Sequence, residues 1–202
     1  MPLLVELFAE LEQHLQQLER RFIRPHLPLP PTADPCAYDL DVRAFCMLSH
    51  AALEQFIEDV CRQLMIDASS SWIDTRQASN TLLALFAFGP ELELELREAS
   101  AEQSFFEYIR QDIDRRKTAF SKVLFENNGI SSKYLRQMLL PVGLNVPDNA
   151  RWLGSLNQLA KQRGETAHRG QVRVIPAPND VLEWVRDCLE MCAQIHRRAT
   201  RV

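Results

Sequence analysis

The chain of 202 residues is predicted to be all-α, a single bundle of about five to seven helices. It contains only six glycines and is rich in Leu, Ala, Gln, Glu and Arg, residues that favour helix. No stretch alternates apolar and polar residues long enough to indicate strands. The hydrophobic residues, 46% of the chain, recur at steps of three and four, as in amphipathic helices.

The first helix is expected from Leu4 to Phe22. Its apolar positions form a heptad-like seam, and Pro25 ends it. The proline-rich stretch 25–37 cannot be helical, because prolines lack an N–H donor and push the preceding residue towards extended geometry. We predict that it is a surface connector inside one domain that spans residues 1–202.

The second helix is expected from Tyr38 to Ile66, and the serines at 69–71 together with Thr75 mark its end. A third, from Ser79 to Phe88, stops at a Gly-Pro pair. The pattern Ser100-x-x-Gln103 predicts a capping box that opens a long helix through residue 124. Asn127-Asn128-Gly129 is expected to close that helix.

The remaining chain predicts three more helices. A short one begins at Ser131 or Ser132 and ends near Leu140, and a longer one begins at Asp148 or Asn149. The last is expected to follow the break at residues 176–178, with Asn179 as its N-cap.

Composition excludes several classes of function. A net charge of −4 at pH 7 argues against broad coating of nucleic acid, so any contact with RNA must be local. No apolar stretch approaches the roughly 20 residues of a membrane span, and Glu6 and Glu10 interrupt any signal-like start. We therefore expect a cytoplasmic protein with no membrane contact. Five cysteines without a C-x-x-C pair favour neither disulfides nor a zinc ribbon.

The last helix offers one pattern with the spacing of metal ligands. Cys188, Cys192 and His196 recur every four residues, but the two thiols fall inside an apolar stripe, and cysteine often packs as a small hydrophobe. We predict core packing there, with no metal and no cofactor.

The pair Arg163 and His168 carries the chemistry that RNA cleavage without a metal requires. An imidazole with a pKa near 6.5 can take a proton from a ribose 2′-hydroxyl, and a guanidinium can hold the charge that grows on the phosphate. Both residues lie near the end of one amphipathic helix. Basic groups at a helix C-terminus also favour the helix dipole, which is a purely structural alternative.

The spacing alone does not single out this pair. Arg21 and His26 have the same spacing, and Arg43 and His50 have six residues between them. Arg163 and His168 differ in their surroundings, because Lys161, Arg169 and Arg173 make this the densest basic patch near a histidine. We expect these three residues to contact RNA.

Geometry restricts how the pair can act. Residues five apart on an ideal helix point about 140° away from each other. Arg163 and His168 can therefore serve one phosphate only if the helix loosens between them, which Gly164 could allow, or if two protomers share the site.

The segment Leu159-Ala-Lys-Gln-Arg163-Gly-Glu-Thr-Ala-His168-Arg-Gly170 resembles the Arg-x4-6-His signature of HEPN domains, which lies just before the last helix of an all-α bundle. Leu48-Ser-His50-Ala-Ala-Leu-Glu54-Gln-Phe56-Ile-Glu58-Asp is similar to the second helix of HEPN proteins of the RiboL-PSP and MAE_28990 types. The order of these motifs along the chain matches as well.

This resemblance implies a metal-independent endoribonuclease of toxin-antitoxin or anti-phage defence systems, which leaves 2′,3′-cyclic phosphate ends. It implies a homodimer in which the motifs of two protomers meet, with Arg163 and His168 as the catalytic pair and an antitoxin or other defence protein as a possible partner. The family often has a polar residue directly after the arginine. Here Gly164 stands there, so Glu165 is a candidate supporting residue, as is Glu54, which shares a helix face with His50.

Two other interpretations stay open at this stage. The first is a non-catalytic HEPN module that holds a partner or senses a nucleotide through the same basic pocket. The second is an unrelated helical bundle whose first helix mediates assembly.

Overall fold

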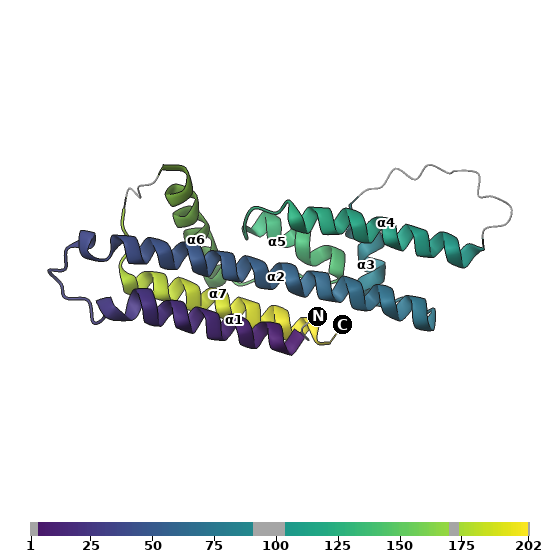
Figure 1. Cartoon of the computed structure of the whole chain (residues 1–202), viewed down its shortest axis with the longest axis horizontal. Coiled ribbons are helices and arrows are strands. Elements are labelled where there is room, and N and C mark those ends of the chain that lie inside the picture. Colours follow the sequence, from purple (N-terminus) through teal and green to yellow (C-terminus); the bar gives the residue numbers. More distant parts are fainter. Residues whose placement is uncertain (1–3, 91–103, 170–173, 202) are drawn as a thin grey trace.

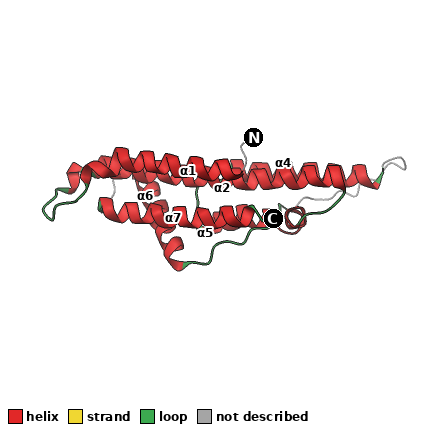
Figure 2. Ribbon diagram, turned by 90° about the horizontal axis from the view of Figure 1, so that it is seen from below, coloured by secondary structure: helices red, strands yellow, loops and turns green. Residues whose placement is uncertain are grey.

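The computed structural model describes residues 4–90, 104–169 and 174–201, with the backbone alone for 167–169. Within these residues the chain forms seven α-helices and no strand, so the all-α prediction is confirmed. The helices α1 (Leu4–Leu18), α2 (Asp39–Thr75) and α7 (Pro178–Ala199) lie lengthwise beside one another (Figure 1). A view turned by 90° shows two layers, with α1 and α4 in one and α5 and α7 in the other (Figure 2).

The first helical stretch has nearly the predicted length but changes its geometry. The α-helical part ends at Leu18, and a π-helical segment, Glu19–Ile23, continues it. The wider turn is held by the Arg24 N–H, which donates to the carbonyl of Glu19. A short 3-10 turn that contains Pro25 follows. The predicted connector then leads to a second 3-10 turn, Pro35–Ala37, just before α2.

Helix α2 is the axis of the molecule, and its predicted end at Ile66 is wrong. It runs on to Thr75, which makes 37 residues or about 55 Å. The serines do not break it, because the Ser69 hydroxyl donates to the Met65 carbonyl of the same helix at 2.7 Å. Apolar packing holds the extension, since Ala68 is buried in a small cluster with side chains of α3 and α4.

Helices α3 (Asn80–Phe88), α4 (Phe105–Phe125) and α5 (Ser132–Leu139) pack on the second half of α2 (Figure 1). The predicted capping box at Ser100 and Gln103 lies outside the described residues. A capping box is present at Ser104, whose hydroxyl accepts from the Glu107 N–H while the Glu107 carboxylate accepts from the Ser104 N–H. The predicted helix end before Asn127 and the start at Ser132 are confirmed.

The last two helices form a tightly packed pair. Helix α6 (Ala150–Arg169) begins where predicted, because the Asn149 side chain accepts from the backbone N–H of Arg151 at 3.0 Å. Asn179 is not the N-cap of α7, contrary to prediction. Ala177 takes that place in extended geometry, as a residue before a proline prefers, and Pro178 occupies the first helical position, which needs no N–H donor.

One continuous apolar core joins α1, α2, α6 and α7 and the shorter helices between them. Cys188 and Cys192 are fully buried in it, and the His196 ring stacks on Phe8 with centroids 5.2 Å apart. A buried polar pair also links α6 to α7, because the Ser155 hydroxyl donates to Asp187 at 2.6 Å. Among the described helices, none combines the length and the apolar character that crossing a bilayer requires.

Candidate functional site

Arg163 reaches from α6 to the loop between α4 and α5. Its side chain is half-buried, and its Nη1 donates to the carbonyl oxygen of Asn128 at 2.9 Å. This bond joins two parts of the chain that are 35 residues apart. The position of the motif arginine is therefore fixed by a loop outside its own helix.

One face of α2 supplies the side chains that lie close to this arginine. His50, Glu54 and Glu58 recur every four residues and so share that face. His50 is only 1% exposed, and its Nδ1 lies 3.6 Å from Glu54 Oε2. The Asn127 Nδ2 donates to both Glu54 Oε1 and Glu58 Oε1, each at 3.0 Å. We call His50, Glu54, Glu58, Asn127, Asn128 and Arg163 the polar cluster.

The electrostatics show that the members of the polar cluster act on one another. Burial, with a smaller contribution from the Arg163 guanidinium, lowers the pKa of His50 from 6.5 to about 4. Burial and the Glu58 carboxylate raise the pKa of Glu54, while Arg163 and a backbone hydrogen bond from Gly129 oppose that rise. Burial also raises the pKa of Glu58. His50 is therefore a neutral imidazole at pH 7.

Gly129 allows the loop to pass close over the His50 ring. Its φ is +152°, a conformation that residues with a side chain rarely adopt. A Cβ at this position would lie 3.8 Å from His50 Cε1 and 3.9 Å from a ring carbon of Tyr134. The glycine is therefore required by its backbone conformation rather than by a lack of space.

His168 lies in the last turn of α6, where the structure describes the backbone. The helix runs without interruption through Gly164 to Arg169, so the loosening that Gly164 could allow, one of the two alternatives, is absent. Positions 163 and 168 thus keep the angular separation of about 140° of an ideal helix. Within one chain the two residues do not converge by a break in the helix.

The other predicted site residues are only partly brought together. Glu54 lies in the polar cluster, Glu165 is half-buried on α6, and Lys161 is exposed. For Arg169 the structure gives the backbone, and Arg173 lies outside the described residues. Within the described part of the chain, no group of three or more His, Cys, Asp and Glu side chains is arranged to hold a metal ion.

Sequence reasoning missed the loop residues of this site. The local pattern of Asn127, Asn128 and Gly129 predicts only the end of a helix, and nothing in it indicates contacts with residues 35 to 73 positions away. By spacing alone, His50 also fits the loose motif together with Arg43. In the structure Arg43 forms an ion pair with Asp39, whereas the charge that acts on His50 is that of Arg163.

The chain is an all-α bundle with an Arg-x4-His pair just before its last helix, an arrangement that fits the HEPN signature. The family model of RiboL-PSP-HEPN matches residues 5–200, and the chain belongs to this family. Comparison with curated proteins and with solved structures gave no match.

Proposed function

We propose that this HEPN protein is a metal-independent endoribonuclease that works as one domain over residues 1–202. The observation that carries the proposal is the position of Arg163. In the Arg21 and His26 pair, Arg21 is exposed and His26 binds Asp41 at 2.8 Å. Arg163, in contrast, is anchored in the polar cluster by its bond to Asn128. The chain also belongs to the HEPN family, and Arg163 stands at the arginine of the signature that the chain resembles.

In the proposed reaction, His168 takes the proton of a ribose 2′-hydroxyl. The 2′-oxygen then forms a bond to the adjacent phosphorus, and the bond from phosphorus to the 5′-oxygen breaks. The 5′-oxygen leaves with a proton from an acid, and the products are a 2′,3′-cyclic phosphate and a 5′-hydroxyl. Arg163 holds the extra charge on the phosphate. Its guanidinium has donors to spare for this, because the Asn128 carbonyl takes only one of the five N–H groups.

We further propose that the active species is a homodimer. The unbroken α6 keeps positions 163 and 168 on different sides of the helix, so a composite site would take Arg163 and His168 from different protomers. The second His168, which lies on the same helix as this Arg163 and about 140° away from it, would then serve the symmetry-related second site. Lys161, Arg169 and Arg173 would bind the phosphates of the flanking RNA.

Glu54 is proposed as a positioning residue. It lies near Arg163, which opposes the rise in its pKa, and Asn127 ties it to the loop that anchors the guanidinium. Glu165, on the same helix as the motif, is proposed as a second supporting residue. We propose that this activity serves toxin-antitoxin or anti-phage defence in the cytoplasm. An antitoxin or another defence protein would then be its partner.

The test is incubation of the full chain with total RNA in excess EDTA, followed by mapping of the ends. We expect cleavage that leaves 2′,3′-cyclic phosphates. His168→Ala should slow it by about 10²–10⁴-fold and Arg163→Ala by about 10²–10³-fold. Arg21→Ala, in the other pair of the same spacing, is the matched control and should cleave like the wild type.

Two results would count against the enzyme. Equal cleavage by wild type and His168→Ala would point to a contaminating ribonuclease. Intact RNA with every variant, together with binding of RNA or a nucleotide that Arg163→Ala weakens, would favour the non-catalytic HEPN module.

A further inference from the structure

A hollow of about 350 Å³ lies beside the polar cluster, between the end of α3 and the helices α4 and α5. Its floor consists of the buried side chains of Phe120, Met138 and Pro141. At its rim stand Phe88, which is 61% exposed, and Gln137, which is also exposed. The hollow thus combines an apolar floor with an aromatic ring and an amide at its mouth.

Two residues connect this hollow to the polar cluster. Asn127 lines the hollow and also donates to Glu54 and Glu58, and the next residue, Asn128, accepts from Arg163. Tyr134 lines the hollow as well and lies against Gly129, which covers His50. Consecutive Cα atoms are only about 3.8 Å apart, so one short loop borders both the hollow and the anchored guanidinium.

We propose that this hollow binds a nucleobase of the RNA whose phosphate Arg163 holds, an inference that rests on the proposed function. Unstacked bases are bound by aromatic rings and by polar groups that meet their edges. Phe88 and Tyr134 supply the rings, and Gln137 supplies both a donor and an acceptor. The volume falls in the range of ligand pockets.

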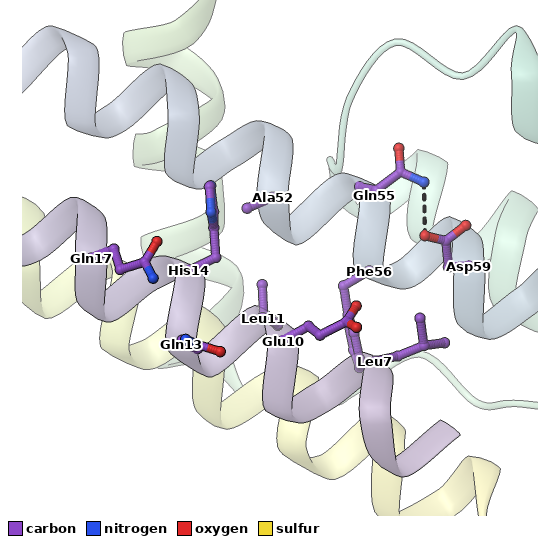
Figure 3. A pocket seen from close by; sticks show the side chains of 10 residues that line it. All are labelled: Leu7, Glu10, Leu11, Gln13, His14, Gln17, Ala52, Gln55, Phe56 and Asp59. Atoms are coloured by element: carbon purple, nitrogen blue, oxygen red, sulfur yellow. Dashed lines mark hydrogen bonds between the residues drawn. The ribbon is translucent and has the colours of Figure 1, made fainter. Parts of the chain in front are cut away.

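A larger hollow elsewhere on the molecule is less suited to such a ligand. It measures about 460 Å³ and lies between α1 and α2, where Figure 3 shows the side chains that line it. Glu10 and Asp59 are among them. Two carboxylates would repel a phosphate that follows the base. Among the described residues that line the smaller hollow, the one carboxylate is that of Glu126, which lies 3.7 Å from the Lys122 ammonium. The loop beside this hollow also anchors the Arg163 guanidinium.

The proposal is tested by binding of fluorescein-labelled hexanucleotides to the full chain, measured by fluorescence anisotropy. The probes are 2′-O-methyl oligomers of adenosine, uridine and cytidine, which lack the 2′-hydroxyl nucleophile and so stay intact. An abasic hexamer with the same backbone measures the phosphate contribution. Adenosine and uridine monophosphates, added as competitors, test whether the hollow also takes a free nucleotide.

Phe88→Ala and Gln137→Ala remove rim groups without disturbing the core. Each should raise the Kd of at least one hexanucleotide by about tenfold, within the range measured for loss of base stacking. The abasic hexamer should bind all variants equally. Phe105→Ala removes another exposed aromatic ring, 79% exposed, at the far end of α4, and Gln13→Ala removes an exposed amide on α1. Both controls should bind like the wild type.

Unchanged affinities for Phe88→Ala and Gln137→Ala, or no binding of any hexanucleotide by the wild type, would overturn the base site. Cleavage that still depends on His168 would then leave the proposed function intact. Binding that depends on Phe88 without any cleavage would support the base site and count against the enzyme. Displacement by a monophosphate with the same dependence on Phe88 would support the site as one for free nucleotides too.

Discussion

His50 should make the folded protein less stable in acid. Its pKa is 6.5 in the unfolded chain and about 4 in the fold, because burial and Arg163 disfavour the charged ring. A lowered folded-state pKa contributes stability that is complete above the unfolded value and is lost as the pH falls towards the folded one. Between about pH 7.5 and pH 5, His50 takes up a proton in the unfolded chain but stays neutral in the folded protein.

The size of this effect follows from the two pKa values. Each pH unit between them is worth about 1.4 kcal/mol, and pH 5 lies about 1.5 units below the unfolded value. His50 should therefore remove about 2 kcal/mol from the free energy of unfolding over this interval. Glu54 and Glu58 act in the opposite direction, since their raised pKa values make the folded state bind protons more readily as the pH falls.

The assay isolates His50 from these carboxylates by comparing variants. Urea unfolding at about pH 7.5 and pH 5 gives the change in stability for the wild type and for His50→Asn, which cannot take up the proton. The wild type should lose about 2 kcal/mol more than the variant. Ile57→Val, fully buried about two turns further along α2, costs about 1 kcal/mol and should keep the pH dependence of the wild type. Equal losses in wild type and His50→Asn would refute the buried neutral imidazole.

Three further predictions concern the loop, the core and the thiols. Asn127→Ala removes two hydrogen bonds to carboxylates and should lower the free energy of unfolding by roughly 1–3 kcal/mol. Asn128→Ala should cost less, because the contact with the motif arginine uses its backbone carbonyl; equal losses in urea melts would contradict this account. Ser155→Ala leaves the buried Asp187 carboxylate without its 2.6 Å donor and should cost about 1–3 kcal/mol by the same measurement, whereas an unchanged midpoint would argue against that bond. Iodoacetamide at pH 8 should label the exposed Cys36 alone, since burial raises the pKa of each of the other four thiols; mass spectrometry that finds a second label on the native protein would contradict their burial.

The helical class and most helix boundaries can be predicted from residues that are close together in the sequence. Helix periodicity and capping depend on residues within about one turn of each other, so the seam of α1 and the start of α6 at Asn149 could be predicted. The motif around Arg163 can also be recognised from the sequence, because it is a contiguous pattern ahead of the last helix. These features need no knowledge of the rest of the chain.

The end of α2 and the set of side chains around Arg163 depend on how distant parts of the chain pack together. Ala68 is buried against α3 and α4, and this packing carries α2 past serines that local propensity treats as a stop. Asn127 meets Glu54 across 73 residues, and Asn128 meets Arg163 across 35. Such contacts depend on how the helices pack, and the period of a single helix contains no information about which distant loop will lie against it.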